Sequence, residues 1–161
     1  MGFLAQLFGR TPARSLNATT VHASQLVGIV GESHRQDTLR RISGTGCGPY
    51  LAELSGHALK VAEKEADSNE RWFRAALFCE RANEYDENAI AVHADGVGHL
   101  GYLSAEDAMD YQPVFTALEA LGSSVAACPA FLIGGVPGKP SYGVMLCLSS
   151  PDRIIRDLTD G

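Results

Sequence analysis

A strand, a tight turn and a second strand form the strongest local folding constraint in this sequence. Ile90 and Val92 alternate on the inward side of a predicted strand at 88–94, and Asp95-Gly96 follows at once. An Asp-Gly pair favours a two-residue hairpin turn because both turn positions need positive φ angles. Residues 98–103 then supply the returning strand. We therefore expect an antiparallel sheet built around this hairpin.

Four further segments are predicted as strands from their apolar composition. They are residues 25–30, 74–81, 125–133 and 142–148. Gly31 ends the first of them, and a stretch rich in glycine and proline, 134–140, joins the last two. The chain thus carries enough predicted strands for a sheet with several members.

Helices are predicted between these strands. Ser33 followed by Gln36 matches a capping box, so a helix is expected to begin at Ser33 and to end before Gly44. The glycine-rich stretch at 44–49 has no Gly-Lys-Ser/Thr, which argues against a phosphate-binding P-loop. Residues 50–66 have helical composition with a division at Gly56, and a turn is expected at 67–70.

A helix at 104–121 completes the predicted elements, and the whole set indicates the fold class. Ser104 with Asp107 is expected to cap this helix, which Pro113 would interrupt. Antiparallel hairpins with a helix between strands fit a barrel better than a parallel α/β sheet. We expect a mainly β fold with helical insertions (α+β), built as a small, partly open antiparallel barrel of the OB-like or SH3-like kind.

The length of 161 residues fits one domain with short extensions. We expect an N-terminal arm at 1–20, a domain at 21–150 and a loose tail at 151–161. Residues 1–10 are apolar. An alternative to a loose arm is therefore a helix that binds a membrane surface or a partner.

Cysteine usage and hydropathy indicate the compartment. Cys47, Cys79, Cys128 and Cys147 are scattered, without C-x-x-C or zinc-ligand spacing. No apolar run approaches the ~18 residues needed to cross a membrane. We expect a cytoplasmic protein with no cofactor, no metal and no membrane partner.

Charge is unevenly distributed along the chain. Residues 1–81 hold ten Lys and Arg against eight Asp and Glu, whereas the remainder holds three against eleven. The net charge of −6 disfavours broad attraction to duplex DNA, which requires many neutralised phosphates. Two local basic clusters remain, each with a solvated face as its alternative: His34, Arg35, Arg40 and Arg41, and Arg71, Arg74 and Arg81.

The segment 80–92 is the best pointer to function. A polar, turn-forming run presents Tyr85 beside Asp86 just before a strand. A ring and a carboxylate side by side can stack on a flat ligand and accept a hydrogen bond from its hydroxyl. The alternatives are that Tyr85 closes the loop against the barrel, and that Asp86 and Asn88 cap backbone amides as Asx turns do.

The chain resembles a HIRAN domain, a family found in Swi/Snf-type DNA-remodelling ATPases and as small stand-alone bacterial proteins. The resemblance covers about residues 25–148, and residues 45–72 look like a helical insertion relative to the animal members of the family. Its most specific part is N-x-Y-D-x-N-A-I-x-V, from Asn83 to Val92. Supporting parts are residues 26–41, residues 97–106 with their Gly-Tyr-Leu, and residues 128–135 with 142–148.

The resemblance implies an OB-like barrel that binds single-stranded DNA at a free 3′ end. By motif, Tyr85 would stack on the terminal base and Asp86 would bond the 3′-hydroxyl, while Tyr102 could contact the strand. The animal members carry a second stacking platform after the first strand. The corresponding stretch here, 30–35, has only His34 as an aromatic residue, although Arg35 can stack or bind a phosphate.

Three hypotheses follow. The first is a non-enzymatic module that binds single-stranded DNA in repair or processing, alone or with a partner helicase or nuclease. Its expected contacts are Tyr85, Asp86, Asn88, His34, Arg35, Tyr102 and Arg81. The second is a protein-interaction domain without DNA binding. The third is a metal-dependent nuclease that uses Glu84, Asp86 and Glu87, a weak metal site because no distant ligand is identifiable.

Overall fold

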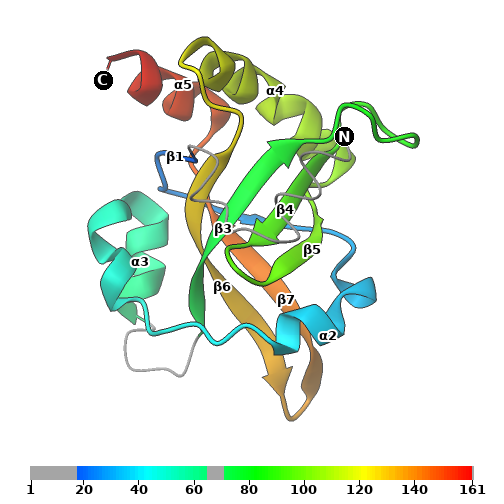
Figure 1. Cartoon of the computed structure of the whole chain (residues 1–161). Coiled ribbons are helices and arrows are strands. Elements are labelled where there is room, and N and C mark those ends of the chain that lie inside the picture. Colours follow the sequence, from blue (N-terminus) through cyan, green and yellow to red (C-terminus); the bar gives the residue numbers. More distant parts are fainter. Residues whose placement is uncertain (1–17, 65–70, 161) are drawn as a thin grey trace.

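One curled, mostly antiparallel sheet with helices around it confirms the predicted α+β, barrel-like fold (Figure 1). The computed structural model describes residues 18–64 and 71–160. Its strands pair in the order β2-β7-β6-β3-β4-β5, and β1 adds to β6 in parallel. They are β1 (Thr19–Thr20), β2 (Leu26–Gly28), β3 (Trp72–Cys79), β4 (Ile90–Ala94), β5 (Gly98–Tyr102), β6 (Ala126–Val136) and β7 (Lys139–Cys147).

The chain just after β2 brings the two ends of the sheet together. The amide of Val30 donates to the Tyr102 carbonyl at 2.8 Å, and the amide of Tyr102 donates back to Val30 at 2.9 Å. Because β2 pairs with β7 and Val30 pairs with β5, the sheet curls back on itself. This contact makes the sheet barrel-like.

The β4–β5 hairpin has the predicted turn in a slightly longer form. Ala94 pairs with Gly98, so three residues, Asp95 to Val97, form the loop, and the amide of Val97 donates to Ala94 at 3.0 Å. Gly96 has a φ of 78°, which a side chain would disfavour. The extra loop residue goes with a register shift between Val92 and His93.

Alternation along β3 separates two sides of the sheet. Phe73, Ala75 and Leu77 lie in the main core, whereas Ala76 and Phe78 belong to a smaller cluster on the other side. On that other side, Trp72 packs against Phe131 with ring centroids 4.6 Å apart. Both layers are therefore ordered by the period of two that the sequence shows.

The predicted insertion is helical and divided where Gly56 predicts. A 3₁₀ helix, η3 (Gly48–Glu53), precedes α3 (Gly56–Lys64). Figure 1 shows α3 beside the sheet, separate from the helices at its other end. Its buried Ala58 and Ala62 share a cluster with Trp72, so the insertion covers this part of the sheet.

Residues 151–161 were expected as a loose tail, and this expectation is wrong. Residues 151–160 form α5 (Pro151–Asp160), which lies beside α4 (Ala105–Ala120) (Figure 1). Ile154 is fully buried, and the hydroxyl of Tyr111 on α4 donates to the Ser149 carbonyl at 2.7 Å. The Ser104 cap is confirmed, since its hydroxyl accepts from the Asp107 amide at 3.1 Å, but α4 runs through Pro113 without interruption.

The predicted capping box at Ser33 is also wrong. Gly31, with a φ of 87°, starts a 3₁₀ helix, η2 (Glu32–His34), so Ser33 lies inside that turn. The helix α2 (Gln36–Arg40) follows without a side-chain cap. Gln36 instead bonds to β7, a partner that lies 106 positions away in the sequence.

Strands β6 and β7 are longer than predicted, since they continue through the glycine-rich stretch to a turn at Pro137-Gly138. Gly134 and Gly135 have φ angles of 78° and 71°, and the register shifts there. Added at Gly135, a Cβ would lie 2.1 Å from the ring of Tyr142. The glycines thus let the hairpin carry a bulge that a strand prediction reads as a break.

Some sequence predictions lie outside the described residues, namely most of the arm at 1–20 and the turn at 67–70. The described end of the arm, Thr19–Thr20, is strand β1. Across residues 18–64 and 71–160, no helix combines the length and the apolar character required to cross a membrane.

Candidate nucleic-acid interface

The loop between β3 and β4 is organised by one side chain, that of Asn83. Its Oδ1 accepts hydrogen bonds from the amides of Tyr85 at 2.9 Å and Asp86 at 3.0 Å. The backbone amide of Asn83 donates to the backbone carbonyl of Glu80 at 2.9 Å. Such side-chain-to-backbone bonds are how asparagine fixes a turn. The loop therefore presents Tyr85 and Asp86 in a defined geometry.

Tyr85 projects from this loop into solvent. Tyr85 is 90% exposed, more than any other large hydrophobic residue in the described part of the chain. A ring that closed the loop against the barrel would be buried. The structure therefore excludes that alternative and leaves both faces of the ring accessible.

Asp86 combines a structural bond with an available oxygen. Its Oδ1 accepts from the Asn88 amide at 2.9 Å, which is the Asx turn that the sequence allowed. Its Oδ2 makes no hydrogen bond with any described residue. One carboxylate oxygen thus shapes the turn while the other can accept a hydrogen bond from a ligand.

Tyr102 joins the same network through Glu80. The Tyr102 hydroxyl donates to Oε1 of Glu80 at 2.9 Å, and Nδ2 of Asn83 donates to the same oxygen at 3.1 Å. Burial and this hydrogen bond raise the pKa of Tyr102. Tyr102 on β5 and the turn that carries Tyr85 are therefore connected by two successive hydrogen bonds.

Arg35 lies on the same side of the molecule as Tyr102. Burial is the largest cause that lowers the pKa of His99, and the positive charge of Arg35 lowers it further. The same charge also favours lower pKa values for Tyr102 and His93. Arg35 and His34 are both exposed. Arg35 lies on the turn between η2 and α2, five residues after Val30, and Val30 pairs with Tyr102.

Two side chains hold that turn against the edge of β7. Oε2 of Glu32 accepts from the Val144 amide at 2.9 Å. The amide group of Gln36 accepts from the Tyr142 amide at 2.9 Å and donates to the Tyr142 carbonyl at 3.0 Å. Because Glu32 and Gln36 flank His34 and Arg35, both ends of the turn are fixed.

Arg81 through its side chain and Asn88 through its backbone carbonyl bond to α4. Arg81 forms an ion pair with Glu119 at 2.7 Å, with both side chains about half exposed. The Asn88 carbonyl accepts from Nε2 of Gln112 at 2.8 Å. The charge of Arg81 is therefore already balanced, and Asn88 serves to anchor the loop.

Sequence reasoning missed a pair of histidines between the loop and Arg35. His93 on β4 and His99 on β5 stack with ring centroids 5.0 Å apart, and His99 meets Tyr102 edge-on at 4.8 Å. Burial, His99 and Arg35 lower the pKa of His93 to about 3. His93 pairs with His99 because the hairpin loop has three residues, whereas counting back from a two-residue Asp-Gly turn would have paired His93 with Gly98.

The metal hypothesis receives no support from the geometry. Across 18–64 and 71–160, no three His, Cys, Asp or Glu side chains lie where they could hold one metal ion together. Glu84 and Glu87 are exposed, and Asp86 is engaged in its turn. The three carboxylates thus remain neighbours in sequence without converging.

Comparisons with models of protein families, with curated proteins and with solved structures found no match for this chain. The HIRAN resemblance therefore stays a prediction that rests on the sequence motif.

Proposed function

We propose that this chain is a cytoplasmic module that binds single-stranded DNA at a free 3′ end, through Tyr85 and Asp86. The observation that carries the proposal is the exposed ring of Tyr85 beside a carboxylate with one available oxygen. A solvent-exposed aromatic ring on an ordered turn is a stacking platform for a base. The four described cysteines are free thiols, which supports a reducing compartment.

The chemistry of Asp86 supports recognition of an end. A carboxylate accepts a hydrogen bond from a hydroxyl but repels a phosphate. A strand that continues past the terminal base would place a phosphodiester where the 3′-hydroxyl binds. Stacking on Tyr85 supplies roughly 1–3 kcal/mol for any base, and Asp86 supplies the preference for a free end.

Arg35 and Tyr102 supply the expected path for the rest of the strand. Arg35 is exposed and lies near Tyr102, which is tied to the Tyr85 turn through Glu80. A guanidinium can bind a phosphate of the strand or stack on a base. This local positive charge fits a short, single-stranded ligand in a chain whose net charge is −6.

The decisive measurement is fluorescence anisotropy with one oligonucleotide in two forms, ending in a 3′-hydroxyl or a 3′-phosphate. The hydroxyl form should bind more tightly, and Tyr85→Ala should weaken both forms. Asp86→Asn keeps an acceptor for the Asn88 amide but removes the charge, so it should bind both forms equally. Glu87→Gln, on the adjacent exposed carboxylate, is the matched control. Equal binding of the two forms by the unmodified protein would exclude end recognition.

A protein-binding role is the second candidate, and the acidic charge together with the exposed Tyr85 favours it. Exposed aromatic rings are frequent anchors of protein interfaces. This role requires no DNA binding even at low salt, together with a stable partner whose binding Tyr85→Ala abolishes. In the favoured proposal the same loop delivers a partner helicase or nuclease to DNA ends in repair or processing.

A further inference from the structure

A row of four aromatic rings crosses the outer face of the sheet, the side of β3, β4 and β5 that faces away from the main core. The row joins Phe78 on β3, His93 on β4, and His99 and Tyr102 on β5, with successive ring centroids 5.0, 5.0 and 4.8 Å apart. Some single-strand-binding domains stack bases on rings along the face of a sheet. Under the proposed function, a strand that ends at Tyr85 would continue along this row.

The β3 end of this row is covered. Phe78 is only 2% exposed. It belongs to a buried cluster on the outer face that also contains Ala76, Ala91 and Val125. In the described part of the chain, the partly buried hydrophobic residues that pack on this cluster are Ala18 and Tyr102. Ala18 offers a single methyl group, and Tyr102 lies at the far end of the row, so the burial of Phe78 requires further apolar side chains over the cluster.

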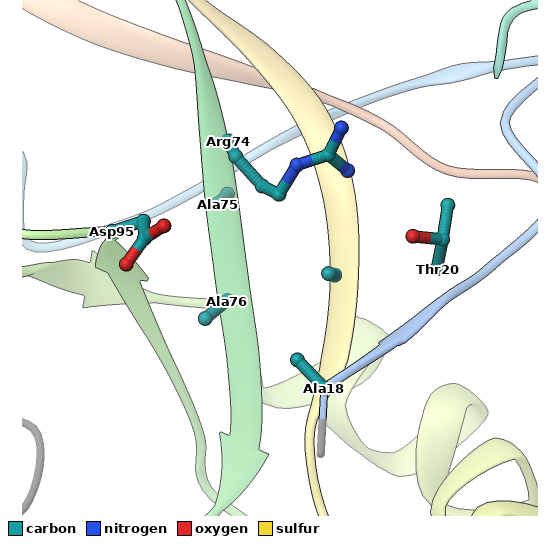
Figure 2. Close-up of a pocket in the computed structure, with 7 residues that line it drawn as sticks. Ala18, Thr20, Arg74, Ala75, Ala76 and Asp95 are labelled. Carbon is teal, nitrogen blue, oxygen red and sulfur yellow. The ribbon is translucent and has the colours of Figure 1, made fainter. Parts of the chain in front are cut away.

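The described chain begins beside this cluster, at Ala18. Strand β1 runs parallel to β6, and the Thr19 amide donates to the Val125 carbonyl at 2.9 Å. Because Val125 belongs to the covered cluster, the chain enters β1 from the side of that cluster. Figure 2 shows Ala18 at this point, and Ala76 on β3 lines the same cavity of about 130 Å³. The residues that precede Ala18 therefore start next to the covered cluster.

The segment before Ala18 has the composition to cover an apolar face. Residues 1–10 are largely apolar. Four of their side chains recur at the spacing of one face of a helix, namely Phe3, Leu4, Leu7 and Phe8. Residues 1–17 also contain Arg10 and Arg14 but no Asp or Glu, in a chain whose net charge is −6. This arm thus combines apolar side chains that suit the cluster with a charge opposite to that of the whole chain.

We propose that residues 3–8 dock on the outer face, cover the cluster around Phe78 and compete there with the DNA strand. The competition rests on the proposed function, whereas the docking does not. Residues 9–17 can span up to about 30 Å when extended. Four strand spacings separate β1 from β5, or about 19 Å, so the arm is long enough to reach any ring of the row. The end site stays free, since Tyr85 is 90% exposed.

NMR spectroscopy of the full chain tests the docking without DNA. Nuclear Overhauser effects should join the ring protons of Phe3 and Phe8 to the methyl groups of Ala76 and Ala91. A mixture of isotope-labelled and unlabelled chains separates contacts within one chain from contacts between two copies. Contacts found only between two copies, or no contact between the arm and these methyl groups, would overturn the proposal.

Two variants that add the same charge locate the docked side of the arm. Phe8→Asp places a carboxylate among the apolar side chains, so Phe3 should lose its contact with Ala76. The ratio of docked to free arm should fall at least about tenfold, the effect of burying one large apolar side chain. Gln6→Asp is the matched control, because position 6 lies off the apolar side of the helical pattern, and it should keep the contact. An unchanged contact in Phe8→Asp would overturn the proposal.

The length of the oligonucleotide tests the competition. A dinucleotide reaches only the end site, so Phe8→Asp and Gln6→Asp should bind it equally. An octanucleotide also reaches the row of rings, so Phe8→Asp should bind it at least about fivefold more tightly than Gln6→Asp, the low end for stacking on one ring. Equal binding of the octanucleotide by the two variants would overturn the competition.

The two proposals fail separately. The comparison of 3′-hydroxyl with 3′-phosphate tests the end site, and the arm contacts are measured without DNA. Loss of end discrimination with the arm contacts present would remove only the role of Asp86. Absence of DNA binding by both variants would overturn the proposed function together with the competition, while the NMR contacts still decide the docking.

Discussion

At the scale of single residues, the stacked histidines show how a side chain's chemistry is set by its neighbours. His93 is largely buried against Phe78 and His99, with ring centroids 5.0 Å away in both cases. Burial comes first in lowering the pKa of His93 to about 3, followed by the charges of His99 and Arg35. Both causes disfavour the imidazolium. His93 is therefore neutral in the folded protein at neutral pH.

The pKa of His93 is lower in the folded protein than in the unfolded chain, and this difference predicts a loss of stability in acid. The unfolded chain has a histidine pKa near 6.5, so below that pH it binds a proton that folded His93 refuses down to about 3. The free energy of unfolding should therefore fall as the pH drops through this window, by at most about 1.4 kcal/mol per unit. His99, whose pKa is also lowered, acts in the same direction. Urea unfolding at a series of pH values measures the slope.

A variant assigns the slope to His93. His93→Phe keeps a ring against Phe78 and His99 but cannot titrate, so the pH dependence between 6.5 and 3 should flatten. The matched control is His57→Asn, because His57 is exposed on α3 and should leave the slope unchanged. An unchanged slope in His93→Phe would contradict the assignment.

The residues of the candidate interface show what local sequence reasoning can and cannot find. The Tyr85-Asp86 turn was predicted because the hydrogen bonds that shape it, made by Asn83 and Asp86, join residues within three positions of each other. The position of Arg35 was not predictable, because it depends on Val30 meeting Tyr102 across the sheet. Arg81 was predicted as a DNA contact, but the ion pair with Glu119 depends on where α4 packs.

At the scale of elements, side chains complete the edge of β7 beyond the end of β2, which pairs only with residues 145–147. Gln36 accepts from the Tyr142 amide and donates to its carbonyl, as a strand residue would. Oε2 of Glu32 accepts a hydrogen bond from the Val144 amide. The sequence placed Gln36 in a capping box, a local role, because a capping pattern carries no information about a strand so far along the chain. The elements were thus largely predictable and their docking was not.

Replacing Gln36 tests this docking. Gln36→Ala leaves two backbone groups of Tyr142 without their partner, at a cost of about 1–3 kcal/mol. Amide hydrogen exchange should quicken at Tyr142 and, as the turn loosens, at Val144. Under the proposed function, DNA affinity should also fall because Arg35 loses its support.

The controls separate the two halves of the amide. Gln36→Glu keeps the acceptor for the Tyr142 amide but loses the donor to its carbonyl, so exchange at Tyr142 should quicken less than in Gln36→Ala. Gln25→Ala removes an exposed glutamine elsewhere and should change neither stability nor exchange. Unaltered exchange at Tyr142 in Gln36→Ala would refute the strand-like role.

At the scale of the whole molecule, one small contact between Val30 and Tyr102 curls the sheet into a barrel-like shape. Hairpin patterns predicted antiparallel pairing, but neither the β2-β7 pairing nor the packing of α5 could be read from them. The β2-β7 pairing joins segments more than a hundred residues apart, and α5 packs on α4 from beyond two intervening strands. Alternation specifies only which face of a strand is buried. The contact between Val30 and Tyr102 is of this kind, and it places Arg35 beside the candidate interface.

Gly101 permits that contact, and replacing it tests whether barrel closure supports the site. A Cβ at position 101 would lie 2.3 Å from the Val30 carbonyl oxygen and 3.2 Å from Cδ1 of Ile29. Gly101→Ala should therefore push Val30 away from β5, at a cost of about 1–3 kcal/mol for overpacking, and should expose the amide of Tyr102 to hydrogen exchange. Gly46→Ala is the control, since no atom lies within 4 Å of the added Cβ.

Under the proposed function, Gly101→Ala should weaken DNA binding while preserving the preference for a 3′-hydroxyl, because Asp86 keeps its turn when Arg35 moves. Loss of that preference together with affinity would mean that the Tyr85 turn depends on the closed barrel as a whole.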